Sequence, residues 1–331
     1  MSDTKIEWTE KTWNPVIGCS KVSAGCANCY ALRMAARMAS NPATPQYQGV
    51  AEFGQSGPRW LSVKCLPEKL AEPLKRRKPT MYFVNSMSDL FHEDVPDDFI
   101  TAVWNVMRKC PQHTFQILTK RPERMASIVQ RLRFDNREGG RVFMAANADD
   151  PESGWSLGVG HLGCSGLVNV WLGVSVEDQA AADERVPYLL NCPAAVRFVS
   201  CEPLLGAVNL REMAWQDDWS INSLDTPDPS CRVHWVIVGG ESGPKARPMH
   251  PGWARSIGDQ CQEAGVPFFF KQWGAFCAPS QMPADIFRAW DHDHGTECWD
   301  GDDPTPWCVG KKAAGRLLDG REWNETPGGA G

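Results

Sequence analysis

Short apolar runs rich in β-branched and aromatic residues recur along the whole chain. A first run spans 12–18, and the others span 81–89, 114–120, 169–177, 196–203, 233–243 and 266–274. Each run places several apolar residues in succession instead of alternating them with polar ones. Strands that are buried on both faces have this pattern, so the sequence predicts a parallel sheet that is covered on both sides.

Helical spacing lies between these runs. Apolar residues recur three and four positions apart in 97–109, 122–133 and 252–265, and Gly265 is a typical helix end. Strands that alternate with helices are typical of α/β proteins. About seven such units predict a full or partial (β/α) barrel, with an open doubly wound sheet as the alternative.

Three segments break the alternation. Two of them, about 135–167 and 207–232, are rich in Gly, Asp, Pro or other polar residues, and we interpret them as insertions in a barrel core of residues 1–274. The third, 275–310, holds Cys277, Cys298 and Cys308 and belongs to a C-terminal extension, 275–331. We expect this extension, with its cysteine-containing loop and basic segment, to pack on the barrel. The spacing of its cysteines matches no metal-binding motif, so a second metal site stays an open question.

The composition is that of a globular protein, with 42% hydrophobic and 22% charged residues in 331. No apolar run has the length of a membrane span, and the first residues lack the apolar core of a secretory signal. We therefore expect a cytoplasmic protein with no membrane partner. A net charge of −6 argues against a broad DNA-binding surface but permits a local basic groove. The candidates for that groove are Lys120, Arg121, Lys311, Lys312, Arg316 and Arg321.

Polar residues follow most of the predicted strands. In an α/β barrel the active site lies at the C-terminal ends of the strands. The residues that we expect there include Ser86, Ser88, Asp89, Lys120, Ser175, Glu177, Cys201, Glu202 and Glu241. A single Ser or Asp at such a place is typical of a helix cap or a turn, so only the convergence of the set predicts a site. Within it, Lys120, Cys201 and Glu202 are the candidate catalytic residues.

Three of the thirteen cysteines, Cys19, Cys26 and Cys29, lie in one loop after the first predicted strand, with a helix expected behind them. Clustered thiols in a cytosolic protein indicate metal or redox chemistry. A structural zinc site takes four ligands, whereas this loop has one C-x2-C pair and no nearby His. Three thiolates fit a [4Fe–4S] cluster with one open iron. A zinc ion with a distant fourth ligand, or three cysteines that only pack, are the alternatives.

The loop, C-x6-C-x2-C-Y, resembles that of the radical S-adenosylmethionine superfamily, in which the usual spacing is C-x3-C-x2-C. The whole chain resembles a narrower group of phage- and prophage-associated proteins of unassigned function. The matching segments read KIEWTEKTWNPVIGCSKVSAGCANCYA, FVNSMSDLF, LTKRPERM, WLGVSVED, EPLLG, VIVGGESG, KQWG and GKKAAGRLLDGREW. Within the superfamily, the loop and the TK strand are most similar to spore photoproduct lyase, a DNA repair enzyme.

This resemblance implies two cofactors, a [4Fe–4S] cluster on Cys19, Cys26 and Cys29 and S-adenosylmethionine on the open iron. A reductant such as flavodoxin or ferredoxin would supply one electron. S-adenosylmethionine would then be cleaved to methionine and a 5′-deoxyadenosyl radical, which removes a hydrogen atom from the substrate. The protein would position these groups and exclude water.

The resemblance also assigns the strand-end residues. Tyr30 would pack near the cluster or the adenine. Ser86, Ser88 and Asp89 would meet the methionine amino group, and Ser175 and Glu177 the ribose. Gly239, Gly240 and Glu241 form a GGE turn that follows the second strand in the superfamily but a late strand here, so a plain tight turn is an equal reading. Lys120 would contact the cofactor carboxylate or a substrate phosphate.

The leading hypothesis is a radical S-adenosylmethionine enzyme that modifies or repairs a nucleic acid or nucleotide. A zinc-stabilised nucleic-acid-binding protein without catalysis is the first alternative. An iron–sulfur protein that does not cleave S-adenosylmethionine is the second. Iron content separates the first alternative from the other two readings, and cofactor cleavage separates the remaining pair.

Overall fold

The computed structural model describes residues 4, 6–135, 141–144, 167–215, 219–228, 231–290, 298–299 and 303–328. Its central sheet has seven strands, and every neighbouring pair is parallel. In spatial order they are β1 (Lys11–Trp13), β6 (Met81–Val84), β7 (Thr114–Thr119), β10 (Val170–Ser175), β11 (Val196–Cys201), β14 (Trp235–Gly239) and β15 (Phe268–Gln272).

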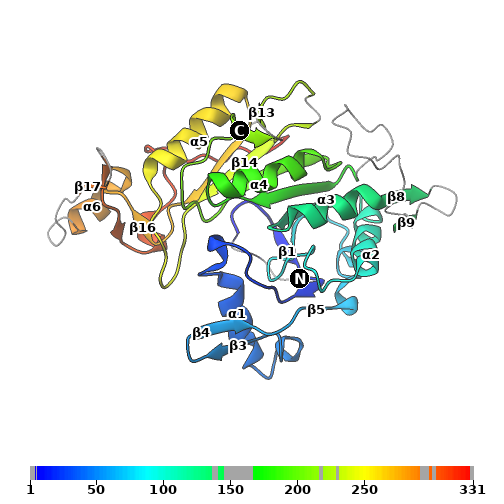
Figure 1. Ribbon diagram of the computed structural model, residues 1–331. Helices are drawn as coiled ribbons and strands as arrows, with labels where there is room; N and C mark the ends of the chain where they lie inside the picture. The colour runs from blue at the N-terminus through cyan, green and yellow to red at the C-terminus, as the bar shows by residue number, and fades with distance from the viewer. Residues whose placement is uncertain are drawn as a thin grey trace.

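The spatial order of these strands is also their order along the chain. A doubly wound sheet reverses its strand order at a switch point, and no reversal occurs here, so that alternative is wrong. The sheet curls into a half-barrel with β1 and β15 at its edges (Figure 1). The prediction of a partial (β/α) barrel is confirmed. Six of the seven predicted runs each contain one strand of this sheet, whereas the first run, 12–18, overlaps β1 only at residues 12–13.

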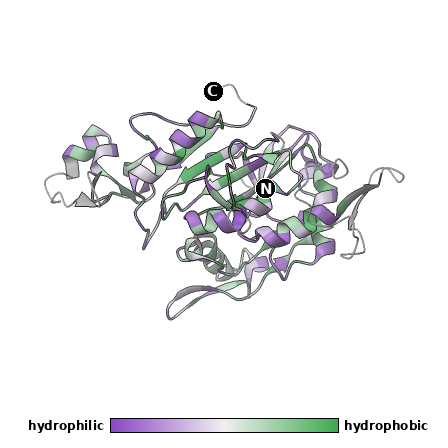
Figure 2. Ribbon diagram, turned by 45° about the horizontal axis from the view of Figure 1, so that its top comes forward, coloured by the Kyte–Doolittle hydropathy of each residue, from purple (hydrophilic) through white to green (hydrophobic). Residues whose placement is uncertain are grey.

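Helices cover the outer face of the sheet. They are α2 (Asp97–Arg108), α3 (Pro122–Arg131), α4 (Gln179–Leu190) and α5 (Pro251–Ala264). Three of them match the predicted spans, and Gly265 ends α5 with a left-handed φ of 63°. Their apolar faces join the outer side of the strands in the main core. Figure 2 shows apolar residues in the central strands and hydrophilic residues on the exposed helix faces.

Aromatic side chains fill the concave side of the half-barrel. This inner cluster is Trp8, Phe83, Trp171, Phe198, Trp235, Ile237 and Phe269. The Trp8 ring centroid lies 4.7 Å from that of Phe83 and 6.2 Å from that of Trp235. Residues near the start of the chain thus plug the barrel interior, so open space is left at the C-terminal ends of the strands.

A small unit with its own core projects from the sheet (Figure 1). It consists of α1 (Tyr30–Ala39) and the hairpin of β3 (Ala51–Gly54) and β4 (Gly57–Trp60). Two further strands, β2 (Val16–Ile17) and β5 (Lys64–Cys65), pair beside it. The helix expected behind the cysteines begins at Tyr30, directly after Cys29.

The C-terminal segment runs along the free edge of β15. Asn324 bridges to Phe269 in antiparallel fashion, and the Phe270 amide donates to the Trp323 carbonyl at 3.0 Å. Ala314 and Leu318 join the main hydrophobic core, so the extension and the barrel share one core. Its elements are β16 (Phe276–Cys277), α6 (Ala284–Trp290), β17 (Cys298–Trp299), β18 (Asp303–Pro304), β19 (Trp307–Cys308) and α7 (Lys311–Ala314).

The two expected insertions lie between the strands of the barrel. A hairpin of β8 (Leu132–Asp135) and β9 (Arg141–Met144) leads into the first, 135–167, and most of that insertion lies outside the described residues. The second contains the hairpin of β12 (Met213–Trp215) and β13 (Trp219–Ile221). Over the described parts of the chain, no helix combines the length and apolar character that crossing a bilayer requires.

Candidate functional site

A pocket of about 280 Å³ opens at the C-terminal ends of the strands. Residues at the ends of β6, β7, β10, β11, β14 and β15 line it, together with the cysteine loop. The predicted site residues among them are Cys19, Cys26, Cys29, Tyr30, Ser86, Ser88, Asp89, Lys120, Ser175, Glu202, Gly240 and Glu241. The structure therefore brings most of the predicted residues to one mouth of the barrel.

Cys201 does not belong to this pocket. Successive strand residues point to opposite faces of a sheet, so Ser200 and Glu202 face the pocket whereas Cys201 faces the helices. Its side chain is fully buried in the main hydrophobic core. The choice of Cys201 as a catalytic residue is therefore corrected. The apolar run of this strand did not show which of its residues face the pocket and which face the helices.

Two of the three loop cysteines have a hydrogen-bond donor beside the sulfur. The Arg121 Nη1 atom donates to the Cys19 sulfur at 3.7 Å. The Ser23 hydroxyl gives its proton to Glu177, so at 3.9 Å its oxygen accepts from the Cys26 thiol. The Cys29 thiol accepts from backbone N–H groups in the first turn of α1. Such donors stabilise a thiolate, which is the form that binds metal.

Burial works against the thiolates in the metal-free protein. It raises the pKa of Cys19 to about 12, with the nearby Asp89 carboxylate adding to the rise, and it also raises the pKa of Cys29. Both thiols are therefore protonated near neutral pH. A metal that binds here has to displace these protons, so its binding is coupled to pH.

The three loop cysteines are the candidate metal ligands of the pocket. Within the described residues, no three Cys, His, Asp or Glu side chains converge closely enough to hold one ion. Zinc needs its ligands around a single centre. A cluster takes one thiolate at each of several irons, so its cysteines stand farther apart. Metal analysis of the reconstituted protein distinguishes the two.

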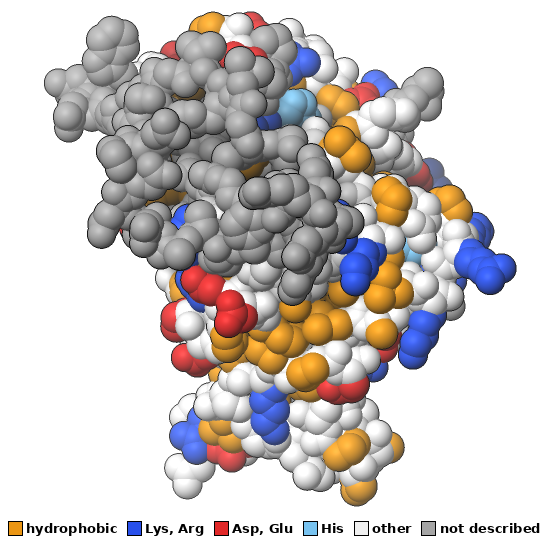
Figure 3. All heavy atoms as spheres, turned by 90° about the vertical axis from the view of Figure 1, so that its right-hand side faces the viewer, with side chains coloured by type: hydrophobic (Ala, Val, Ile, Leu, Met, Phe, Trp, Pro, Cys, Tyr) orange, Lys and Arg blue, Asp and Glu red, His pale blue; other side chains and the backbone are white. Residues whose placement is uncertain are grey.

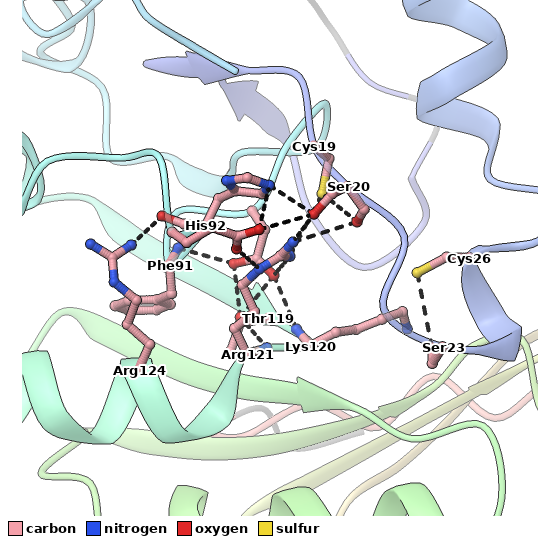
Figure 4. A network of polar contacts seen from close by, with 12 residues as sticks. Cys19, Ser20, Ser23, Cys26, Phe91, His92, Thr119, Lys120, Arg121 and Arg124 are labelled. Carbon is pink, nitrogen blue, oxygen red and sulfur yellow. Dashed lines mark hydrogen bonds and ion pairs between the residues drawn. The ribbon is translucent and has the colours of Figure 1, made fainter. Parts of the chain in front are cut away.

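A buried ion-pair network anchors the start of the cysteine loop (Figure 4). The Asp89 carboxylate accepts from the Thr119 hydroxyl at 2.8 and 2.9 Å and pairs with Arg121 at 3.2 Å. Arg121 also donates to the Ser20 hydroxyl at 2.6 Å. The Asp89 carboxylate thus holds the Arg121 guanidinium in place, and Arg121 in turn contacts the start of the loop at Ser20.

Glu177 anchors the middle of the loop. It pairs with Lys120 at 3.2 Å and with Arg185 at 2.7 Å, and it accepts from the Ser23 hydroxyl. Burial opposes its charge, but these partners outweigh burial and lower the pKa of the Glu177 carboxyl. A Cβ on Gly25 would lie 2.2 Å from a Glu177 carboxylate oxygen, so this close approach requires glycine.

Glu241 anchors the end of the loop. It accepts from the Asn28 side chain at 3.0 Å and pairs with Arg247 at 2.8 Å. Arg247 in turn donates to the Ala24 carbonyl at 3.0 Å. Burial opposes the Glu241 charge, but Arg247 and Asn28 lower its pKa. Three strand-end carboxylates thus hold three parts of one loop, a role that differs from the cofactor contacts expected for them.

The glycines of the GGE turn have a packing reason. A Cβ on Gly239 would lie 2.5 Å from a Glu202 oxygen, and one on Gly240 would lie 1.9 Å from the Trp273 carbonyl oxygen. These contacts are with the protein itself, which favours the tight-turn reading. On the same wall, Glu202 pairs with Lys271 at 2.9 Å, and both side chains keep some exposure to the pocket.

The turn after β6 contains a residue that the sequence analysis overlooked. Ser88 donates to the Val16 carbonyl at 2.8 Å, and Tyr30 donates to the Ser86 carbonyl at 2.7 Å, so these groups fix the turn. Asn85 has a left-handed φ of 61°, is buried, and its side-chain nitrogen has no partner among the described residues. An Asn directly after a buried strand was the available signal, because Asn tolerates this conformation.

The expected basic groove does not form. The described residues that line the pocket include Lys120 and Arg121 but none of the four C-terminal basic candidates. Lys311 pairs with Glu7 at 3.2 Å, and the guanidinium groups of Arg316 and Arg321 stack on Phe269 and Trp323. The reason is that the C-terminal segment follows the edge of β15 instead of folding over the mouth of the barrel.

The side of the molecule seen in Figure 3 also lacks a continuous basic groove over its described part. Its Lys and Arg side chains stand apart, with apolar and uncharged side chains between them. A surface that follows a nucleic-acid backbone gathers several cations along one track. Over its described part, this side presents no such track.

Comparison with known proteins gives one match. The model of a family described as a protein of unknown function, DUF5131, matches residues 3–327. No curated protein and no solved structure matches the chain.

Proposed function

The chain belongs to the DUF5131 family of proteins of unknown function, and we propose that it is a radical S-adenosylmethionine enzyme. In this proposal Cys19, Cys26 and Cys29 hold a [4Fe–4S] cluster, and the pocket beside them binds S-adenosylmethionine. One observation carries the proposal. Three thiols line one pocket at the mouth of a half-barrel, and Cys19 and Cys29 each accept from a hydrogen-bond donor of the protein.

The two bound groups would together supply one-electron chemistry that removes a hydrogen atom from the substrate. The chain contributes binding, orientation and exclusion of water. Trp8, Phe83 and Leu118 give the pocket an apolar floor on which an adenosyl group can rest. Asn85 and Ser175 supply polar groups at its wall, and the anchored loop keeps the three thiols in place.

The substrate class proposed is a nucleotide or nucleic acid. Two aromatic residues, Tyr30 and Trp60, line the pocket, and Tyr30 is 54% exposed. A base can stack on such a ring irrespective of its sequence. The Lys271–Glu202 pair at the opposite wall offers a cation and a carboxylate to polar substrate groups.

The test is anaerobic purification, reconstitution with iron and sulfide, and measurement of metals, spectra and products. The wild type should bind iron and, with dithionite, convert S-adenosylmethionine to methionine and 5′-deoxyadenosine. Cys19→Ala, Cys26→Ala and Cys29→Ala should each lose iron, whereas Cys110→Ala, in the hydrophobic core, should keep it. Stoichiometric zinc without iron would refute the proposal. Iron without cleavage would favour the non-cleaving iron–sulfur alternative.

A further inference from the structure

The surface over the cysteine loop is built from two stretches of chain that contain no acidic residue. Residues 11–51 and 242–258 hold no Asp or Glu, although the chain has 40 of them and a net charge of −6. Both stretches contain several Lys and Arg residues. The acidic excess therefore lies elsewhere in the chain, and these stretches are locally positive.

The structure brings the two stretches together around the loop. The Asn28 side chain donates to the Lys245 carbonyl at 2.7 Å, and Arg33 donates to the Pro244 carbonyl at 3.4 Å. The Lys21 ammonium donates to the Ala27 carbonyl at 3.4 Å. Lys21 and Arg33 of the first stretch and the backbone of Lys245 in the second thus lie beside the segment that carries Cys26 and Cys29.

Apolar side chains lie among these cations. Val22 is 46% exposed and Met34 is 44% exposed, and Met34 stands one helical turn after Tyr30 on α1. We call this surface the loop face. Its members are Lys21, Val22, Arg33, Met34, Arg37 and Lys245, and it borders the pocket at Tyr30.

Only the loop itself separates the loop face from the thiols. The short helix Ala24–Cys26 has no buried residue, and the three cysteines are half-buried. A protein seated on the loop face would therefore lie one layer of backbone from the pocket. Electron transfer needs such a short path, and the proposed function needs one electron from outside for each turnover.

Resting on that function, we propose that the loop face docks a small acidic protein that carries one electron, such as a flavin or iron–sulfur carrier. The carrier is oxidised by one electron and the site is reduced by one. Charge complementarity speeds such encounters, and exposed apolar groups at the centre of the contact hold them. Apart from Tyr30, the exposed apolar groups are aliphatic, whereas single-stranded nucleic acid is held mainly by aromatic rings, so the carrier is favoured.

The test measures binding of oxidised flavodoxin to the full chain at low and high salt. The variant Lys21→Glu, Arg37→Glu, Lys245→Glu should weaken binding by about tenfold or more at low salt, and salt should erase most of this difference. The matched control is Lys75→Glu, Arg77→Glu, Lys78→Glu. It makes the same charge change at exposed residues before the start of β6, at the opposite end of the strands, and should leave binding unchanged.

A double variant, Arg37→Glu with Lys245→Glu, preserves the Lys21 contact to Ala27. Weaker binding by this variant therefore cannot come from loss of that contact within the cysteine loop. Equal binding by the loop-face and control variants would overturn the proposal. Binding of single-stranded DNA or RNA with this variant dependence, without flavodoxin binding, would overturn it in favour of a nucleic-acid surface.

A second readout separates this proposal from the proposed function. Cleavage of S-adenosylmethionine driven by dithionite should be equal in the wild type and the double variant, while cleavage driven by flavodoxin should show a higher KM for the carrier. If iron binds and dithionite-driven cleavage occurs but flavodoxin binding is the same in all variants, only the proposal of the docking surface is refuted. If no iron binds but flavodoxin still follows the charge changes, only the enzymatic function fails.

Discussion

Replacement of Arg121 tests the network that holds the start of the cysteine loop. The Arg121 side chain is 10% exposed and its partner Asp89 is 8% exposed, so their ion pair is almost out of water. Removing one member of such a pair leaves the other charge buried and costs about 3 kcal/mol or more. Arg121→Gln should therefore lower the free energy of unfolding by about 3 kcal/mol and the melting temperature by roughly 4 °C.

Arg121→Lys is the matched comparison. Lysine keeps the charge beside Asp89 but lacks the planar fork that reaches Asp89, Ser20 and the Cys19 sulfur together. It should cost about 1 kcal/mol of stability, yet lower the iron retained after reconstitution as Arg121→Gln does. The two variants thus separate the charge of Arg121 from its geometry.

The assay is urea and thermal unfolding of the metal-free protein, read by circular dichroism, with Asp89→Asn and the double variant completing a cycle. Residues in one network couple, so the double variant should be more stable than the sum of the single changes predicts, by about 1 kcal/mol. Additive effects, or an unchanged melting temperature in Arg121→Gln, would refute the buried pair.

Two further changes test the other anchors. Gly25→Ala should reduce iron retention while leaving the barrel folded, since the added Cβ would lie 2.2 Å from a Glu177 oxygen. If iron per chain and the circular dichroism spectrum both match the wild type, the close approach of Gly25 to Glu177 is refuted. Glu241 has a pKa below the ordinary value of 4.5, so its charge stabilises the fold above pH 4.5, and this contribution is lost as the pH falls through the lowered pKa. Glu241→Gln should therefore flatten the fall in stability on the acid side, measured by unfolding between about pH 3 and pH 6, and an unchanged slope would contradict the shift.

The order of apolar runs was enough to identify the strands of the half-barrel. Runs buried on both faces are visible in sequence because several apolar residues follow one another, and six of the seven runs contain a strand of the single parallel sheet. The first run, 12–18, lies mostly beyond β1. Since the C-terminal ends of parallel strands share one edge, residues such as Ser88 and Ser175 could be assigned to one mouth with Cys29 before any contact was known.

Only the tertiary structure decided what those residues do. Ser23 and Glu177 are 154 positions apart, and Asn28 and Glu241 are 213 apart, so no local pattern reports that these carboxylates hold the loop. The face taken by Cys201 depended on where β11 begins its alternation, which periodicity leaves uncertain by a residue. The path of the C-terminal segment followed from the free edge of β15, because unpaired strand groups there accept another backbone. Sequence periodicity reports which face of its own helix or strand a residue takes. Its contacts with residues far away in the sequence are decided by how the whole chain packs.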